Sequence, residues 1–398
     1  MQADNCAVFL SVENINGQQA VLIENMERLL IQAEWLENMG RLMIIPGDGI
    51  GPEIMDATVN ILDYIINKKN LKVEYEFAIM GGCSIDKYGT PLTDSVLEAC
   101  RQSRAILLGA VGGPKWASTD PARPRPEDAL LKLRKELGLY ANLRPIKVYD
   151  PLISASTIKE QIIKGVDILF LRELTGDVYF GKKERIVKDG VITAYDTMIY
   201  RDYEIERAAR MAFEIARTRR KKVTSVEKSN VVESSRLWRE ITIKVHKDFP
   251  DIELIHMYVD NAAMQLVRNP GQFDVIVISN MFGDILSDEA AMIAGSIGLI
   301  PSASLRDDFF GLYEPIHGSA PDIAGLDKAN PLGTILSMAL MFKYSFRQEE
   351  IAAMIEKAVN TVLEKGFRTS DIYDPAAGGS SLVSTKEMGN AVLAEIKI

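Results

Sequence analysis

Residues 274 to 289 read D-V-I-V-I-S-N-M-F-G-D-I-L-S-D-E, and the interpretation of the rest of the chain starts from this stretch. The apolar run 275 to 278 predicts a strand that is buried on both faces, as in a parallel sheet. Residues 280 to 283 predict a turn, and the residues after them have helical spacing. Asp284 and Asp288 are then four positions apart on one helical face, where two carboxylates repel each other unless a cation neutralises them.

An ordinary structural role explains these two aspartates about as well. Asp284 can serve as the N-cap of the helix, and Asp288 can lie in its first turn, where the positive helix end favours a carboxylate. A third aspartate favours the other interpretation, because the strand-like run 252 to 259 leads directly into Asp260 and another helical segment. Ligands of open α/β sheets bind at the carboxyl ends of strands, so we expect Asp260, Asp284 and Asp288 to converge there.

Three carboxylates are hard oxygen ligands, and they suit Mg²⁺ or Mn²⁺. Zinc would favour histidine or thiolate ligands. The three histidines are too scattered in the sequence to suggest a zinc site (His246, His256 and His317).

Length and charge narrow the class of protein. The chain has 398 residues and no linker, repeat or low-complexity tract, which predicts two intimately joined α/β lobes. Its net charge of −9 argues against nucleic acid as a partner and requires that any anionic substrate meet a local cluster of arginines. No apolar run reaches the roughly 18 residues that span a membrane. Three cysteines without motif spacing fit a reducing cytoplasm (Cys6, Cys83 and Cys100).

Residues 1 to 40 differ from the body of the chain. They contain six acidic residues against one arginine, Arg28, so they account for −5 of the total charge. Transit peptides are basic, and secretory signals need a basic start and an apolar centre, so neither description fits. Met26, Leu29, Leu30 and Leu36 can form one apolar stripe of a helix that docks on the body. Alternatively, the segment precedes a later natural start such as Met39.

The body opens with an apolar strand at 42 to 45, the loop P-G-D-G-I-G-P-E at 46 to 53, and helical periodicity at 54 to 66. Gly47, Gly49 and Gly51 give G-x-G-x-G, which only approaches the dinucleotide fingerprint G-x-G-x-x-G, so a tight structural turn explains them at least as well. A second buried strand is predicted at 105 to 108. The proline-rich residues 121 to 126 belong to a long loop that we expect to act as a ligand lid.

Three arginines follow on successive predicted elements. Arg134 lies on a helix one turn after Leu130, Arg144 follows beyond that helix, and Arg172 ends a buried strand at 168 to 171. Each alone is more typical of solvated surface charge. Together with a divalent cation they predict a pocket for a small di- or tricarboxylate, because guanidinium groups bind carboxylates bidentately.

Two further features lie between this pocket and the aspartates. Asp189-Gly190 separates two strand-like runs, which predicts a projecting hairpin suited to a clasp between subunits. Lys228 follows a predicted strand at 222 to 226 and so lies at the functional edge of the sheet. A lysine there is usually solvated, but nearby positive charge can turn it into a proton acceptor.

Seven ordered blocks resemble the isocitrate and isopropylmalate family of β-decarboxylating dehydrogenases over residues 41 to 398, most closely its 3-isopropylmalate dehydrogenases. They are I-P-G-D-G-I-G-P-E, L-R-K-E-L-G-L-Y-A-N-L-R-P, R-E-L-T-G-D-V-Y-F-G, E-K-S-N-V-V, Y-V-D-N-A-A-M-Q-L-V, N-M-F-G-D-I-L-S-D and Y-E-P-I-H-G-S-A-P-D-I-A-G. The resemblance implies a two-lobed α/β fold with a mostly parallel sheet, and not a G-x-G-x-x-G Rossmann fold. It implies an acidic extension at 1 to 40, an NAD-binding domain formed by 41 to 139 and 293 to 398, and a second domain at 140 to 292 with the dimer interface and clasp.

The resemblance also implies the reaction, which is oxidative decarboxylation of 3-isopropylmalate with NAD and Mg²⁺ or Mn²⁺, a step of leucine biosynthesis. Sibling reactions on tartrate or malate, homoisocitrate or isocitrate are the alternatives. Tyr179 and Lys228 are implied as the acid-base pair, with Lys228 and Asp260 completing the site of the partner subunit in a homodimer. The implied substrate contacts are Arg134, Arg144, Arg172, Asp260 and Leu130; the metal ligands are Asp260, Asp284 and Asp288; and the NAD contacts are Pro114, Glu127, Glu314, Gly318, Ser319, Ala320, Pro321, Asp322, Ile323 and Asn330.

Proteins of other classes fit the sequence less well. A metal-dependent phosphatase or nuclease could use clustered aspartates, but the chain lacks a strand-end D-x-D motif. A silent regulatory subunit should have lost a catalytic group, and none is lost here. Departures from the family pattern are modest and concern loop details (Asp177, Glu227, Ser234 and Ser235).

Overall fold

The computed structural model describes residues 40–120, 122–376 and 378–398, and its core is one continuous sheet of ten strands. The predicted properties of residues 1 to 39 lie outside the described part of the chain. The strand order across the sheet is β2-β1-β3-β12-β11-β4-β5-β10-β8-β9. The strands are β1 (Gly40–Gly47), β2 (Val73–Phe77), β3 (Ala105–Ala110), β4 (Ala141–Lys147), β5 (Asp167–Glu173), β8 (Lys222–Glu227), β9 (Glu253–Tyr258), β10 (Val275–Ile278), β11 (Pro301–Leu305) and β12 (Gly311–Pro315).

Most of the strand pairings are parallel. Antiparallel pairing occurs where β4 meets β5 and β11, and where β11 meets β12. The predicted α/β class with a mostly parallel sheet is therefore confirmed. The strands of 41 to 139 and 293 to 398 occupy one half of the order and those of 140 to 292 the other half, whereas the division into two domains stays a prediction.

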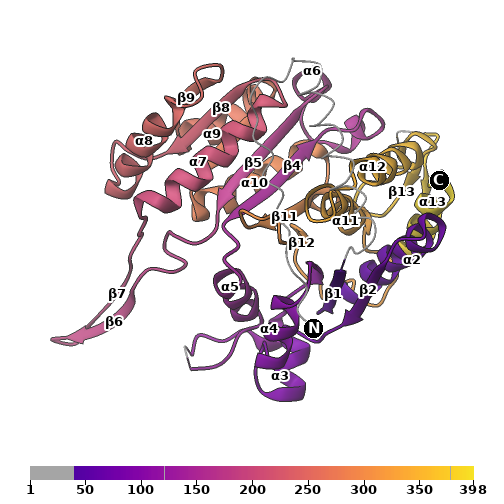
Figure 1. Cartoon of the computed structure of the whole chain (residues 1–398), viewed down its shortest axis with the longest axis horizontal. Coiled ribbons are helices and arrows are strands. Elements are labelled where there is room, and N and C mark those ends of the chain that lie inside the picture. Colours follow the sequence, from indigo (N-terminus) through magenta and orange to yellow (C-terminus); the bar gives the residue numbers. More distant parts are fainter. Residues whose placement is uncertain (1–39, 121, 377) are drawn as a thin grey trace, which may run out of the picture.

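Helices cover the sheet on both sides and leave the hairpin outside it (Figure 1). The α-helices are α2 (Gly51–Lys69), α3 (Gly82–Tyr88), α4 (Asp94–Arg101), α5 (Pro126–Glu136), α6 (Glu160–Ile163), α7 (Asp202–Arg217), α8 (Glu233–His246), α9 (Val259–Arg268), α10 (Asn280–Ala291), α11 (Leu332–Tyr344), α12 (Glu349–Glu364) and α13 (Thr385–Glu395). Short 3-10 helices lie at Pro114–Trp116, Asp150–Ala155, Pro270–Gln272, Met292–Ala294 and Ile297–Leu299. None of the helices in the described ranges has the length and apolar character needed to cross a membrane.

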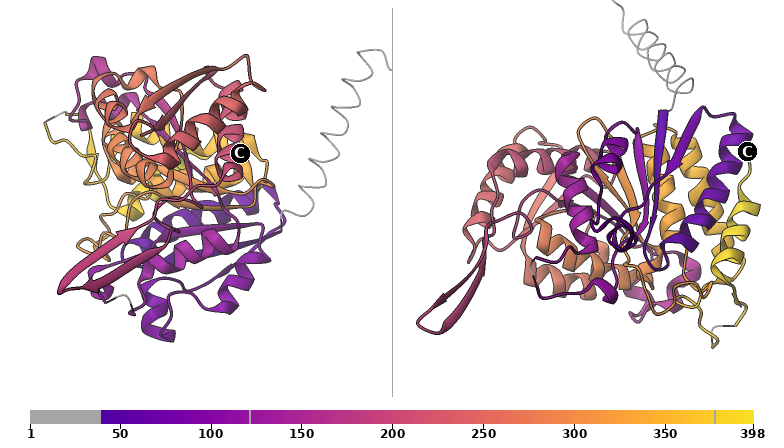
Figure 2. Two further views of the ribbon diagram at one scale, coloured as in Figure 1. Left: turned by 90° about the vertical axis from the view of Figure 1, so that its left-hand side faces the viewer. Right: turned by 90° about the horizontal axis from the view of Figure 1, so that it is seen from below.

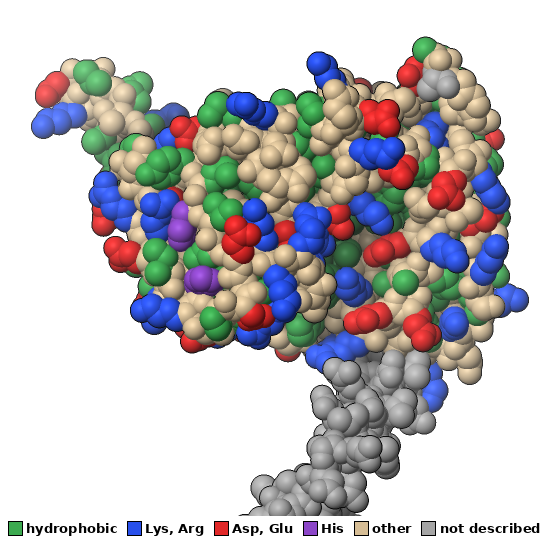
Figure 3. Space-filling model, turned by 90° about the horizontal axis from the view of Figure 1, so that it is seen from above, with side chains coloured by type: hydrophobic (Ala, Val, Ile, Leu, Met, Phe, Trp, Pro, Cys, Tyr) green, Lys and Arg blue, Asp and Glu red, His purple; other side chains and the backbone are tan. Residues whose placement is uncertain are grey.

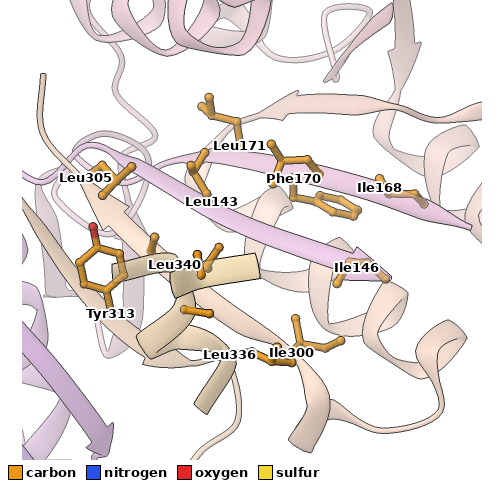
Figure 4. Close-up of a cluster of buried hydrophobic side chains, with 14 of the residues drawn as sticks. Leu143, Ile146, Ile168, Phe170, Leu171, Ile300, Leu305, Tyr313, Leu336 and Leu340 are labelled. Atoms are coloured by element: carbon orange, nitrogen blue, oxygen red, sulfur yellow. The ribbon is translucent and has the colours of Figure 1, made fainter. Parts of the chain in front are cut away.

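Strands β1 and β3 bury side chains on both faces, which explains their apolar runs. Leu42 and Ile44 of β1 belong to the large core cluster, whereas Met43 and Ile45 belong to a second cluster on the opposite face. This is the period of two that strand geometry imposes. The large cluster continues across the middle of the sheet, where residues of β4, β5 and β11 meet Leu336 and Leu340 of α11 (Figure 4).

The order of the strands determines on which face of the sheet each connecting helix lies. The connections β5 to β8 and β8 to β9 run outward across the sheet, whereas the connection from β9 to β10 runs back inward. Because such crossovers are right-handed, α7 and α8 lie on one face and α9 lies on the other. Helix α9 packs against α10 there. The two helices that carry the predicted metal ligands are therefore neighbours.

The Asp189-Gly190 hairpin is confirmed as β6 (Lys183–Lys188) paired with β7 (Val191–Asp196). Both central residues have positive φ, 51° and 78°, as a two-residue turn of this kind requires. The hairpin extends away from the body in all views (Figures 1 and 2), and Figure 3 shows hydrophobic side chains on it at the upper left. Val187, Val191 and Ile192 are exposed by 63 to 70%. In the described structure this arm has two apolar sides without a covering layer.

The predicted turn at 280 to 283 is wrong, because these residues form the first turn of α10. Groups remote in sequence satisfy the first N–H groups of the helix. The Asn280 N–H donates to the Tyr200 hydroxyl at 2.8 Å, and the Met281 N–H donates to Asp177 Oδ2 at 3.1 Å. Gly283 is needed for close packing and not for a turn, since a Cβ atom there would lie 2.9 Å from Arg172 Cγ.

Candidate active site

Helix α10 presents both predicted aspartates to two arginines from neighbouring strands. The alternative in which Asp284 is an N-cap is wrong, because Ser279 occupies the cap position. Arg144 of β4 donates from Nη2 to Asp284 Oδ1 at 3.2 Å and from Nη1 to Asp288 Oδ1 at 3.1 Å. Arg172, at the end of β5, also forms an ion pair with Asp284. The charges of Asp284 and Asp288 are thus neutralised by arginines in the isolated chain.

Two amide side chains hold these arginines in place. Arg144 Nε donates to Asn142 Oδ1 at 2.7 Å, and Arg172 Nε donates to Asn280 Oδ1 at 2.9 Å. Ser287 Oγ accepts a further hydrogen bond from Arg144 Nη1 at 2.8 Å. Sequence reasoning missed all three partners. A signal was present for Asn142, which lies two residues before Arg144 and so on the same face of a strand.

Tyr179 joins the same cluster through its hydroxyl, which donates to Asp284 Oδ2 at 2.7 Å. Its ring lies 5.5 Å from the guanidinium carbon of Arg172. Burial and the neighbouring charge of Asp284 raise the pKa of Tyr179. The phenol therefore keeps its proton at neutral pH and is available as a proton donor.

The charges of the cluster shift one another's pKa values. Burial lowers the pKa of Arg172 to about 10, and Arg144 contributes to the same shift. Burial raises the pKa of Asp284, but Arg172 and Arg144 outweigh that effect, so the net shift is downward. The pKa of Asp288 is raised, mainly by burial, although Arg144 opposes the shift. The pKa of Asp284 is therefore the lower of the two.

Arg134 approaches from the other half of the sheet. It lies on α5 and forms an ion pair with Glu314 of β12, with 2.8 Å between Nη2 and Oε1. Both side chains are nearly buried, and Arg134 Nε has no hydrogen-bond partner in the described structure. Leu130, one turn earlier, is half-buried and packs against the core beneath α5. The guanidinium group keeps unused donor capacity beside an apolar side chain.

Lys228 and Asp260 form a separate pair, with 2.8 Å between Nζ and Oδ1. Asp260 follows β9, and two strand spacings, about 10 Å, separate β9 from β10. The predicted convergence of three aspartates within one chain is therefore wrong. Among the described residues, no three Asp, Glu, His or Cys side chains come close enough to hold a metal ion.

The predicted NAD segments lie on both sides of the glycine turn after β1. Gly49 approaches Ser319 so closely that a Cβ atom would lie 2.0 Å from the Ser319 carbonyl oxygen. At Gly112 the corresponding Cβ atom would lie 2.9 Å from Glu127 Oε1. The structure supports a tight structural turn at 47 to 51. Pro114 begins a 3-10 helix in the predicted lid, within which Pro121 lies outside the described residues.

The second NAD segment has free space and an unused polar atom. A Cβ atom at Gly318 would meet no atom within 4 Å, and the buried Nε2 atom of His317 has no hydrogen-bond partner in the described part of the chain. Asn330 is different, because its side chain donates to Asp371 Oδ2 at 3.0 Å and accepts from the Leu332 N–H at 3.0 Å. The other predicted contacts of this segment line the same loop between β12 and α11 (Ser319, Ala320, Pro321, Asp322 and Ile323).

Comparison with known proteins gives one consistent result. A family model described as isocitrate/isopropylmalate dehydrogenase matches residues 41–392. A 3-isopropylmalate dehydrogenase of Clostridium acetobutylicum is 58% identical over 357 residues, covering 89% of this chain and 99% of that protein. A protein of the same name from Pseudomonas putida is 55% identical, covering 90% of this chain and 99% of that protein.

Solved structures agree in fold. The isocitrate dehydrogenase of Methylococcus capsulatus superposes with a TM-score of 0.79 at 34% identity, covering 90% of this chain and 99% of that one. A β-decarboxylating dehydrogenase of Thermococcus kodakarensis gives 0.71 at 35% identity, covering 89% and 96% of the two chains.

Proposed function

The chain belongs to the isocitrate/isopropylmalate dehydrogenase family, and on this premise we propose that it oxidises and decarboxylates 3-isopropylmalate to 4-methyl-2-oxopentanoate in leucine biosynthesis. Enzymes of this family are decarboxylating oxidoreductases, and the chain is one of them. The observation that carries the proposal is the cluster of Arg144, Arg172, Tyr179 and Asp284, in which a proton donor lies beside cations and a carboxylate.

Substrate binding is assigned to the three arginines. Arg144 and Arg172 are held in place by their ion pairs with Asp284, so a dicarboxylate would meet guanidinium groups that are already oriented. Arg134 supplies the third guanidinium group, whose Nη2 atom is paired with Glu314 and whose buried Nε atom has no hydrogen-bond partner in the described structure. The substituent at C3 of the substrate then faces the apolar side chain of Leu130.

The metal site fits Mg²⁺ or Mn²⁺ when two chains contribute. Asp284 and Asp288 are both partly exposed, by 35% and 48% of their side chains, and so are open to a hydrated ion. We assign the third carboxylate to Asp260 of the partner subunit, because Asp260 does not group with this pair among the described residues of one chain. The bound cation would polarise the C2 oxygen and stabilise the negative charge that develops when carbon dioxide leaves.

Two side chains move protons in the proposed mechanism. Lys228 accepts the proton of the C2 hydroxyl as the alcohol is oxidised, and its partner Asp260 orients the amino group. Tyr179 donates its proton to C3 after carbon dioxide has left, and its raised pKa keeps the phenol protonated until that step. Asp284 accepts the hydrogen bond of this phenol and so holds it in position.

We assign NAD to the region between the two predicted segments. The open position beside Gly318 and the unpaired buried nitrogen of His317 offer room and a polar contact. NAD⁺ would accept the hydride from C2. We propose NAD and not NADP because Asp322 is exposed on the same loop, where a carboxylate accepts hydrogen bonds from a ribose 2′-hydroxyl and repels a 2′-phosphate.

The position of exposed apolar surface supports the proposed homodimer with shared sites. Met264 and Val267 of α9 and Ile285 of α10 are exposed by 50 to 61%, and they lie on the helices that carry Asp260 and Asp284. An exposed apolar patch of this kind marks a protein contact. A second copy docked there would cover the patch and bring its own Lys228 and Asp260 to the arginine cluster.

The proposal is tested by incubating the purified protein with NAD⁺, Mg²⁺ and 3-isopropylmalate while following the absorbance of NADH. Release of carbon dioxide is measured in the same samples. NADP⁺, isocitrate and malate serve as alternative substrates, and a chelator is the metal control. Full activity in the presence of chelator, a higher kcat/KM with NADP⁺, or isocitrate as the best substrate would each contradict a named part of the proposal.

A further inference from the structure

Asp48 is a buried carboxylate within the glycine turn, and the proposed mechanism gives it no role. It is only 3% exposed, and no ion pair reaches it within the described ranges. A buried carboxylate without a cation must be stabilised by hydrogen bonds. Three backbone N–H groups supply them: Gly82 to Oδ2 at 2.8 Å, Cys83 to Oδ1 at 2.8 Å, and Gly112 to Oδ2 at 3.0 Å.

These donors come from two different segments. Gly82 and Cys83 begin α3, whereas Gly112 belongs to the loop after β3 that leads into the predicted lid. The loop is attached to α3 a second time, because Trp116 Nε1 donates to Asp86 Oδ1 at 3.1 Å and Lys115 Nζ lies 2.6 Å from Asp86 Oδ2. The Trp116 ring also packs on Gly82, where a Cβ atom would lie 2.4 Å from it. The loop after β3 and helix α3 are thus joined at two places, and Asp48 makes the buried one.

The same turn also holds the second NAD segment. The Ile50 N–H donates to the Ser319 carbonyl oxygen at 2.9 Å, and Gly49 leaves no room for a side chain against Ser319. The turn therefore holds two loops. The Asp48 side chain contacts the loop that begins at Gly112, and the backbone of the turn contacts the loop at 318 to 323. Loops that enclose a ligand must be held at a fixed separation for the ligand to bind tightly.

We propose that Asp48 is a positioning residue for the cofactor: its carboxylate fixes the loop at 112 to 116 relative to the loop at 318 to 323, so that both grip the dinucleotide. The G-x-G-x-G turn thus acts by holding its neighbours and not by cradling phosphates. This inference rests on the proposed use of NAD. Asp48 would act through the two loops without touching the cofactor itself.

The test compares Asp48→Asn with Asp274→Asn. In Asp48→Asn the side-chain amide would offer one acceptor oxygen to three N–H donors and would place its own N–H₂ group against the others. The KM and Kd for NAD⁺ should rise about tenfold, with little change in the KM for 3-isopropylmalate. Asp274 is an equally buried carboxylate that accepts from Arg219 Nε and the Arg220 N–H at 2.8 Å each, at the start of β10. Its variant should lose stability without a selective rise in the KM for NAD⁺.

A second readout reports loop position without catalysis. With 5-fluorotryptophan incorporated, the ¹⁹F resonance of Trp116, assigned with Trp116→Phe, should shift or broaden in Asp48→Asn, while that of buried Trp238 stays unchanged. An unchanged Trp116 resonance together with wild-type NAD⁺ affinity would overturn the inference. If the wild type itself binds no NAD⁺, the proposed function fails instead, and the two failures are distinguished.

Hydrogen exchange on the unmodified protein covers the case in which Asp48→Asn does not fold. Added NAD⁺ should slow exchange in peptides spanning 46 to 51 and 81 to 86 together with those spanning 112 to 120 and 318 to 325. Protection of the last two alone would show that the turn does not link them, and would also overturn the inference.

Discussion

Arg134 and Glu314 form a nearly buried ion pair at 2.8 Å, and it joins a proposed substrate contact to a proposed cofactor contact. Glu314→Gln should therefore weaken both ligands. The amide keeps one acceptor oxygen but leaves the Arg134 charge without a counterion, so we expect kcat/KM to fall about tenfold for NAD⁺ and for 3-isopropylmalate.

Steady-state kinetics with each substrate varied in turn checks this prediction. Glu204→Gln is the matched control, because Glu204 is also buried and pairs with Arg201 at 2.9 Å, at the start of α7. It should lower stability without raising either KM. A rise in only one KM of the Glu314→Gln enzyme would show that the pair does not couple the two ligands.

Much of this site could be predicted because local patterns carry it. The buried run 275 to 278 forms the strand that its apolar residues indicate, and the Asp189-Gly190 signal forms the hairpin. Asp284 and Asp288 share a helical face because that depends only on spacing. Arg172 at a strand end also required only local reasoning, whereas the resemblance to the family alone implied Tyr179.

The remaining features depend on contacts that local sequence does not encode. Residues 280 to 283 look like a turn, yet they are helical because Tyr200 and Asp177 satisfy their N–H groups from other segments. Asp177, one of the departures from the family pattern, has a φ of 71°, and its carboxylate accepts the hydrogen bond of the Met281 N–H at the start of α10. The separation of Asp260 from Asp284 follows from strand order, which the sequence did not reveal.

The two proposed metal ligands, Asp284 and Asp288, should differ in their effect on the free energy of unfolding. Spacing alone suggests that Asp284→Asn relieves repulsion and leaves stability unchanged, but the structure reverses this expectation, because Arg172 is almost fully buried and would lose its carboxylate partner. We expect a loss of about 2 kcal/mol in the free energy of unfolding. Asp288→Asn removes a carboxylate that is itself half-exposed and leaves buried Arg144 paired with Asp284, so at most about 1 kcal/mol should be lost.

Urea unfolding of both variants, combined with turnover at saturating Mg²⁺, measures these effects. Both variants should lose turnover, and only Asp284→Asn should shift the unfolding midpoint appreciably. Equal midpoints would mean that Arg172 finds another acceptor.

Stability should fall in mild acid because of His256. Burial lowers the pKa of this side chain to about 4, with smaller contributions from Arg239 and His246, whereas its ordinary value is 6.5. Between these two values the unfolded chain holds a proton that the folded chain does not, so the His256 contribution to stability is present above pH 6.5 and is lost as the pH falls toward 4. His256→Gln should flatten this part of the pH profile.

Thermal unfolding at several pH values compares the variant with the wild type. The two melting curves should keep a constant separation above about pH 7, and the wild type should lose more of its Tm than the variant between pH 6.5 and pH 4. Parallel profiles over that range would contradict the role of His256.

Shared active sites predict recovery of activity in hybrid dimers. Lys228→Met should suppress oxidation, because the C2 hydroxyl loses its proton acceptor, whereas Tyr179→Phe should allow hydride transfer and block the later protonation. In a mixed dimer one site combines both mutant residues and the other combines the two intact residues. Mixing the variants after reversible dissociation should therefore restore part of the wild-type rate.

Subunit exchange must be confirmed by mass spectrometry of differently tagged chains. Each variant mixed with itself is the control and should stay inactive. No recovery in confirmed hybrids would place Lys228 and Tyr179 in the same site of one chain.

Substrate choice should depend on Leu130, which lies one helical turn before Arg134. The 2-hydroxy acid and the departing carboxylate are common to the substrates of the family, so the arginines and the metal ligands cannot distinguish them. Isocitrate would place a third carboxylate against this apolar side chain, which is strongly unfavourable without a partner. An isopropyl group gains instead from the contact, and each methylene group is worth roughly 1 to 3 kcal/mol in such a pocket. Leu130→Ser should therefore lower kcat/KM for 3-isopropylmalate by about tenfold or more and leave that for malate nearly unchanged.

Leu130 also packs against the core beneath α5, so a purely structural role has to be separated from substrate contact. Loss of packing would lower stability and would reduce the rates with both substrates in the same proportion. Leu131→Ser, at the neighbouring half-buried leucine of α5, is the matched control for a polar substitution on this helix. The pocket role requires that the ratio of the two kcat/KM values change more at position 130 than at 131. An unchanged ratio in Leu130→Ser would assign the side chain to the core, and the selectivity would then have to arise elsewhere along the helix.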